Sequence, residues 1–139
     1  MMHLKNFVVL VVCPLFVFAK VEIPPDLEAE IDEYFEQCFE PNGVTMDDIK
    51  AYKMGDKDPK IMCFMRCLFV SGKWMDENEN MQYDYIKETI HHAIRHITIP
   101  ELENCGKEAQ TGDKCEKSFN FFMCMNRAEP EDWILDYKS

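Results

Sequence analysis

The sequence predicts a small all-α domain that is held together by disulfides. Apolar residues recur with the period of an α-helix in several segments, whereas almost no segment alternates like a half-buried strand. A length of 139 residues corresponds to one domain. Six of the seven cysteines lie beyond residue 19. An even number of cysteines in a short exported chain is typical of a disulfide framework.

Residues 1–19 have the pattern of a secretory signal peptide. Lys5 supplies the positive start, and residues 7–18 form an apolar run that is too short to cross a bilayer of roughly 30 Å. Val17 and Ala19 are the small residues that a signal peptidase accepts, so we expect cleavage after Ala19 and a mature domain over residues 20–139. An uncleaved anchor or a buried first helix is the alternative. No later stretch is apolar enough to span a membrane, and we therefore expect a soluble, secreted, extracellular product.

The chain is strongly acidic. Its formal net charge is −11, and loss of Lys5 with the signal peptide would change it to −12. Nucleic acids and anionic membrane surfaces select basic patches, so neither is expected as a partner.

Two helices are predicted in the first part of the mature chain. After Pro24 and Pro25, an apolar stripe with helical spacing comprises Leu27, Ile31, Tyr34, Phe35, Cys38 and Phe39. Asn42 and Gly43 then break the chain. The run from Thr45 to Asp48 resembles a capping box and starts a short helix.

The next predicted helix covers residues 60–70 and is apolar nearly all round, which indicates a central, buried helix. A fourth helix is predicted over residues 83–97. We expect Pro100 to lie in the first turn of a new, short fifth helix that carries Leu102 and Cys105. The last helix is predicted over residues 114–126.

Helical geometry restricts how the six cysteines can pair. Cys63 and Cys67 are four residues apart on one helix, where a disulfide between them would constrain almost nothing. Cys115 and Cys124 would lie on opposite sides of their helix and about 13 Å apart along it. Because a disulfide spans at most roughly 7 Å between Cα atoms, this pair is excluded as well. About ten of the fifteen pairings remain open.

The order of the cysteines resembles the six-cysteine pattern of the insect odorant-binding and pheromone-binding proteins. The spacing is Cys38-x24-Cys63-x3-Cys67-x37-Cys105-x9-Cys115-x8-Cys124, of which the x3 and x8 gaps are that family's tightest features. The segments 63–69 and 74–78 also resemble the family's third helix and the loop after it. The resemblance covers essentially the whole mature chain.

This resemblance implies about six helices around an apolar cavity and the disulfides Cys38–Cys67, Cys63–Cys115 and Cys105–Cys124. It also implies a carrier that binds odorants, pheromones or similar small hydrophobic molecules and delivers them through an aqueous secretion toward receptors. Family members also occur outside smell organs, so a salivary or reproductive scavenger or interaction protein is the alternative. The expected partners are a small hydrophobic ligand and, left open, an olfactory receptor or a second copy of the chain.

Apolar residues of several segments are candidates for the cavity lining, with plain core packing as the alternative for each of them. On the central and last helices and between them these are Phe64, Met65, Leu68, Phe69, Trp74, Ile90, Phe119, Phe122 and Met123. In the acidic tail, four large apolar residues are expected to fold over the cavity mouth as a lid, and plain docking elsewhere or a dimer contact is the alternative. They are Trp133, Ile134, Leu135 and Tyr137.

Three histidines lie close together at the predicted end of the fourth helix. A helix C-terminus favours charged histidine, so His91, His92 and His96 are candidates for a switch that lowers ligand affinity on acidification. Three solvated helix-end histidines are the alternative. His92 and His96 have the spacing of metal ligands, but no further ligand pattern supports them, and we expect no metal and no cofactor.

Two other classes of protein are the alternatives to a carrier. No nucleophile elbow, phosphate loop or zinc-protease helix occurs in the sequence, so an enzyme is not expected. A saposin-type lipid-interacting protein shares the size and the helicity but has another cysteine spacing, and stable membrane insertion is not expected.

Overall fold

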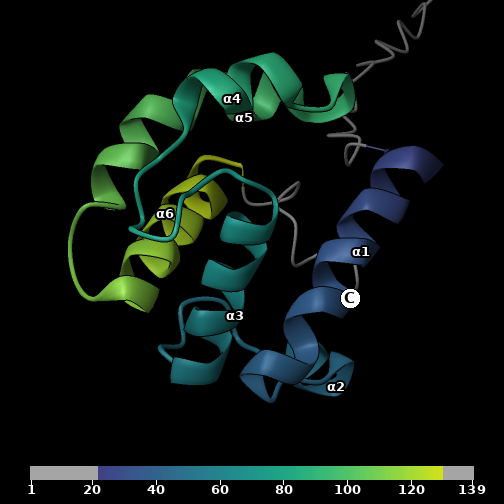
Figure 1. Cartoon of the computed structure of the whole chain (residues 1–139), viewed down its shortest axis with the longest axis vertical. Helices are drawn as coiled ribbons and strands as arrows, with labels where there is room; N and C mark the ends of the chain where they lie inside the picture. The colour runs from purple at the N-terminus through teal and green to yellow at the C-terminus, as the bar shows by residue number, and fades with distance from the viewer. Residues whose placement is uncertain (1–21, 130–139) are drawn as a thin grey trace, which may run out of the picture.

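The computed structural model describes residues 22–129. Within this range the chain forms helices and a single isolated β-bridge, Met75 to Met81, so the all-α prediction is confirmed (Figure 1). The predicted signal peptide and the four tail residues proposed as a lid lie outside the described residues. No helix between residues 22 and 129 is long and apolar enough to cross a membrane. The helices are α1 (Pro25–Asn42), α2 (Met46–Ala51), α3 (Pro59–Ser71), α4 (Tyr83–Thr89), α5 (His92–Glu108) and α6 (Lys114–Ala128).

Helix α1 forms because of its apolar stripe and its two ends. Proline at the first helical position is already fixed at a helical φ, and Gly43 ends the helix in the left-handed conformation with φ 61°. The side chain of Asn42 donates to the carbonyl of Cys38 at 2.8 Å, which satisfies a backbone acceptor of the last turn. The stripe is buried at Leu27, Ile31, Phe35 and Cys38.

The starts of the next two helices are capped by side chains. Thr45 and Asp48 form the predicted capping box of α2, with the Asp48 amide donating to Thr45 Oγ1 at 3.2 Å and the Thr45 amide donating to Asp48 Oδ2 at 2.8 Å. Asp58 caps α3 by accepting from the Lys60 amide at 2.9 Å.

Helices α3 and α6 form the centre of the molecule, and α1 and α5 pack against them from either side (Figure 1). Aromatic rings fill the contacts: the Phe69 and Phe121 rings lie edge to face at 5.1 Å between centroids, and Phe35 meets Phe64 at 5.3 Å. The prediction of a central, buried helix is therefore confirmed for α3.

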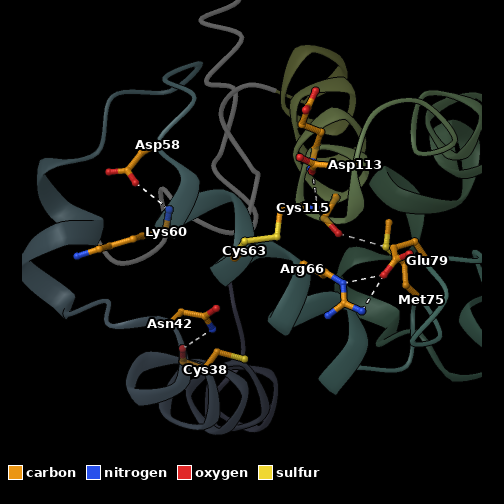
Figure 2. Close-up of a disulfide and its surroundings, with 12 residues drawn as sticks. Cys38, Asn42, Asp58, Lys60, Cys63, Arg66, Met75, Glu79, Asp113 and Cys115 are labelled. Carbon is orange, nitrogen blue, oxygen red and sulfur yellow. Dashed lines mark hydrogen bonds and ion pairs between the residues drawn. A yellow bond between two sulfur atoms is a disulfide. The ribbon is translucent and has the colours of Figure 1, made fainter.

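Three disulfides connect the packed helices in series. Cys38–Cys67 joins α1 to α3, Cys63–Cys115 joins α3 to α6 (Figure 2), and Cys105–Cys124 joins α6 to α5. These are the pairs that the family resemblance implies. Cys63 and Cys67 reach two different neighbours, as the spacing argument requires. Helices α2 and α4 carry no cysteine, so no disulfide holds them; α4 is joined to α5 by the ion pair between Lys87 and Glu103 at 2.6 Å.

The prediction for residues 83–108 is wrong at two points. The chain breaks at Ile90 and His91, both with ψ near 135°, and α5 then runs through Pro100 without interruption. His91 starts α5 because its Nδ1 accepts the Ala93 amide at 3.1 Å. Pro100 removes only one backbone hydrogen bond, and the packing of α5 on α6, which buries Leu102 and Cys105, outweighs this loss.

A buried ion pair holds the loop between α3 and α4. The Arg66 guanidinium on α3 contacts Glu79 Oε1 through two nitrogens at 2.7 and 2.8 Å and donates to the Glu77 carbonyl at 3.0 Å (Figure 2). The side chain of Glu79 is only 5% exposed, and its backbone has φ 61°. We call the contacts of Arg66 with Glu77 and Glu79 the clamp; they hold the loop that carries Trp74 against α3.

Candidate functional site

An apolar cavity lies where α1, α3, α4, the start of α5 and α6 meet. Its volume is about 120 Å³, below the roughly 300 Å³ at which ligand pockets commonly begin, and it opens to solvent on one side. Its lining residues are Leu27, Glu30, Ile31, Tyr34, Phe35, Leu68, Phe69, Gly72, Trp74, Tyr85, Thr89, Ile90, His91, Ile94 and Phe122.

The structure brings together some of the residues predicted to line the cavity and leaves others out. Leu68, Phe69, Trp74, Ile90 and Phe122 do line it. Four other predicted residues are buried in the hydrophobic core and lie outside the cavity lining: Phe64, Met65, Phe119 and Met123. For these four residues the structure matches the alternative of core packing: Phe64, for example, packs on the rings of Phe35 and Phe39.

The wall formed by α1 was missed by the sequence reasoning. Leu27, Ile31, Tyr34 and Phe35 all line the cavity. They belong to the apolar stripe that the sequence already showed on this helix. The stripe predicts the inward face of α1, but it gives no information on whether that face meets a helix or a void.

The polar residues of the lining lie together where the cavity opens. We call Glu30, Tyr34, Tyr85 and Thr89 the mouth of the cavity. The Tyr34 hydroxyl donates to Glu30 Oε1 at 3.1 Å, and the Thr89 hydroxyl donates to the Tyr85 carbonyl at 2.6 Å. Partial burial, together with the negative charge of Glu30, raises the pKa of Tyr34 to about 12, so the phenol is neutral at physiological pH.

His91 bridges α1 and α5 at the edge of the cavity. Its Nε2 lies 2.9 Å from Asp26 Oδ2, and its ring stacks on that of His92 with 4.3 Å between centroids. Since Nδ1 accepts from the Ala93 amide, the proton is on Nε2, which donates to the carboxylate. This hydrogen bond holds the pKa of Asp26 below its usual range.

The histidines do not lie at a helix C-terminus, so that part of the switch argument is wrong. His91 caps the N-terminus of α5, His92 is its first residue and His96 lies one turn later. The helix dipole at this end disfavours a positive charge. Residues 22–129 contain no group of three His, Cys, Asp or Glu side chains that could hold a metal ion.

A second hollow lies on the surface over the disulfide that joins α3 to α6. Charged side chains, including Lys57, Lys114 and Glu116, and the backbone around Cys63–Cys115 line it. It is wider than the cavity but more open. The cavity beneath α1 is the better candidate for apolar ligands because five of its lining residues are buried apolar side chains: Leu27, Ile31, Phe35, Phe69 and Phe122.

A helical domain with disulfides between its helices and a solvent-connected apolar cavity is typical of small binding proteins. Comparison with known proteins gives the family. The family model of the PBP/GOBP family matches residues 20–128. The chain therefore belongs to this family, the insect odorant-binding and pheromone-binding proteins, and the saposin-type alternative is set aside.

Proposed function

We propose that this protein is a secreted carrier that binds a small hydrophobic molecule in the cavity between α1, α3 and α4 and transports it through an aqueous secretion toward a receptor. The single observation that supports the proposal most is the cavity itself, in a chain of a family of binding proteins. A scavenger of the same fold in saliva or a reproductive secretion is the alternative, and the tissue of expression distinguishes the two.

The shape of the cavity supports a ligand with a compact apolar body. Leu27, Ile31 and Phe35 from α1 face Phe69 and Phe122 across it, and all five side chains are buried. An apolar cavity of about 150 Å³ in another protein stays dry and accepts benzene. The cavity of about 120 Å³ is of similar size, so a single ring or a short chain fits the enclosed part and a longer ligand extends through the mouth.

Displacement of a fluorescent probe tests the proposal. Phenylnaphthylamine, an uncharged probe, is bound to the oxidised protein and displaced by a panel of volatile alcohols, esters and aldehydes. The test variant is Ile94→Trp, which fills the cavity from α5. Its matched control is Ile99→Trp on the same helix, where the half-buried isoleucine lies outside the lining.

We expect micromolar displacement with the wild type and with Ile99→Trp, and at least tenfold weaker probe binding with Ile94→Trp. Equal binding by all three proteins would place the ligand elsewhere. No probe binding by the wild type would remove the carrier proposal and favour a role in binding another protein.

A further inference from the structure

Apart from the half-buried Tyr34 and His91, the polar residues that line the cavity are exposed. Glu30 and Thr89 are exposed, and Tyr85 is 39% exposed. Of the apolar lining residues from α1, α3 and α6, all are buried except Leu68, which is half-buried. A ligand whose apolar body fills the interior must therefore place its polar group against the mouth.

Hydrogen bonds within the mouth leave mainly acceptors for this polar group. The Tyr34 hydroxyl hydrogen is donated to Glu30, and the Thr89 hydroxyl hydrogen is donated to the Tyr85 carbonyl, so both oxygens keep only their lone pairs. Glu30 is a carboxylate, which accepts only. At His91, Nε2 faces Asp26 and Nδ1 faces the Ala93 amide, so both ring nitrogens are engaged. In the described part of the mouth, only the exposed Tyr85 hydroxyl can act in either role.

The lining of the cavity carries one negative charge, that of Glu30, and the Lys73 ammonium beside Tyr85 offsets part of it. Glu30 is a carboxylate, whereas none of the described residues that line the cavity is Lys or Arg. The hydrogen-bond partner of Glu30 in the mouth is the neutral hydroxyl of Tyr34. A cationic ligand group would therefore gain an attraction here that a neutral group lacks, and a ligand carboxylate would be repelled.

Three electron-rich aromatic rings also belong to the cavity lining. Tyr34, Trp74 and Tyr85 all line the cavity. Gly72 lies between the rings of Tyr34 and Trp74. If Gly72 were an alanine, its Cβ would lie 3.8 Å from Tyr34 Cε2 and 3.7 Å from Trp74 Cδ1, so both rings are close to this glycine. The ammonium of Lys73 lies 5.9 Å from the centre of the Tyr85 ring, so this ring can hold a cation, and a ligand ammonium would have to displace Lys73 from it.

We propose that the mouth makes the cavity selective for protonated primary amines with a small apolar body over alcohols, aldehydes and carboxylates of the same skeleton. The ammonium donates up to three hydrogen bonds to the acceptors of the mouth, and the rings and Glu30 stabilise its charge. An aldehyde offers only an acceptor, and a carboxylate adds repulsion. This inference rests on the proposed function, because it assigns the ligand class of the same cavity.

A series with one carbon skeleton tests the inference by displacement of phenylnaphthylamine. Benzylamine, benzyl alcohol, benzaldehyde and benzoate share the ring and differ only in the polar group. At neutral pH we expect benzylamine to compete about three- to tenfold more strongly than benzyl alcohol, from an exposed ion pair and a cation–π contact, and benzoate to compete most weakly. The advantage of benzylamine should decrease with added salt, whereas competition by benzyl alcohol should not.

The variant Glu30→Gln isolates the charge. Glutamine retains an oxygen that accepts from Tyr34, and Glu30 is exposed, so the fold is preserved. We expect the ratio of amine to alcohol affinity to decrease to about one to two. The matched control is Glu36→Gln, which removes the same charge from an exposed position of α1 outside the lining and should keep the ratio of the wild type.

Two results would overturn the inference: equal competition by benzylamine and benzyl alcohol in the wild type, or an unchanged amine advantage in Glu30→Gln. Both results leave the proposed function intact, since the neutral ligands still compete. Failure of every ligand, together with failure of the probe to bind, would instead refute the proposed function.

Discussion

The ion pair between Arg66 and Glu79 allows a direct test of how burial determines the contribution of an ion pair to the free energy of unfolding. Two pairs in the described chain have the same N–O distance of 2.7 Å: Arg66–Glu79, with side chains 25% and 5% exposed, and Arg127–Glu108, with side chains 61% and 46% exposed. Distance alone predicts equal contributions to stability. Desolvation predicts very different ones.

Replacement of Arg66 by Met removes the charge and keeps most of the apolar stem. Glu79 then remains a buried carboxylate without its cation, which in a fully buried pair costs about 3–5 kcal/mol. Because Arg66 is one quarter exposed and water can partly replace it, we expect a loss of about 2–3 kcal/mol and a decrease in Tm of about 10 °C. Arg127→Met should lose at most about 1 kcal/mol, because both of its side chains are exposed.

Urea unfolding of the oxidised proteins, followed by circular dichroism, measures both losses. A double-mutant cycle with Glu79→Gln gives the coupling, which we expect to be about 1–2 kcal/mol, with the double variant more stable than additivity predicts. Probe binding should also weaken in Arg66→Met, because the clamp fixes the loop that carries Trp74. Equal losses for Arg66→Met and Arg127→Met, or a coupling near zero, would refute this reasoning.

Three further predictions concern the disulfides and pH. Cys63–Cys115 closes a loop of 52 residues, the longest of the three, so replacing both cysteines by serine should lower the free energy of unfolding in urea by about 4 kcal/mol. Cys105–Cys124 closes only 19 residues. A smaller loss of stability for Cys63–Cys115 than for Cys105–Cys124 would contradict the loop-entropy argument. If His91, His92 and His96 form the predicted acid switch, ligand affinity should decrease from pH 7 to pH 5, and equal affinities at the two pH values would reject the switch. The pKa of Tyr34 is raised to about 12 from 10.0, so the contribution of Tyr34 to stability is complete below pH 10 and decreases as the pH rises through 12. The free energy of unfolding of the wild type should therefore decrease over this range relative to that of Tyr34→Phe. A constant difference between the two proteins would contradict the shift.

The sequence by itself determined the features that depend on local spacing. The stripe and the terminal glycine of α1, the capping box of α2 and the apolar surface of α3 are each properties of a few neighbouring residues. The cysteine spacing was equally informative. It excluded Cys63–Cys67 on local geometry alone, and it indicated the family to which the chain belongs.

Only the tertiary structure decided where the helical segment after residue 83 breaks and which apolar faces meet the cavity. Pro100 predicted a break on local grounds, but the packing of α5 on α6 outweighs one missing hydrogen bond, and the break occurs at His91, where a side chain can cap. Phe64 and Phe69 are indistinguishable on the apolar face of α3, yet only Phe69 lines the cavity. Periodicity determines that a side chain points inward, whereas a void depends on how the opposing helices approach, which is a property of the whole packing.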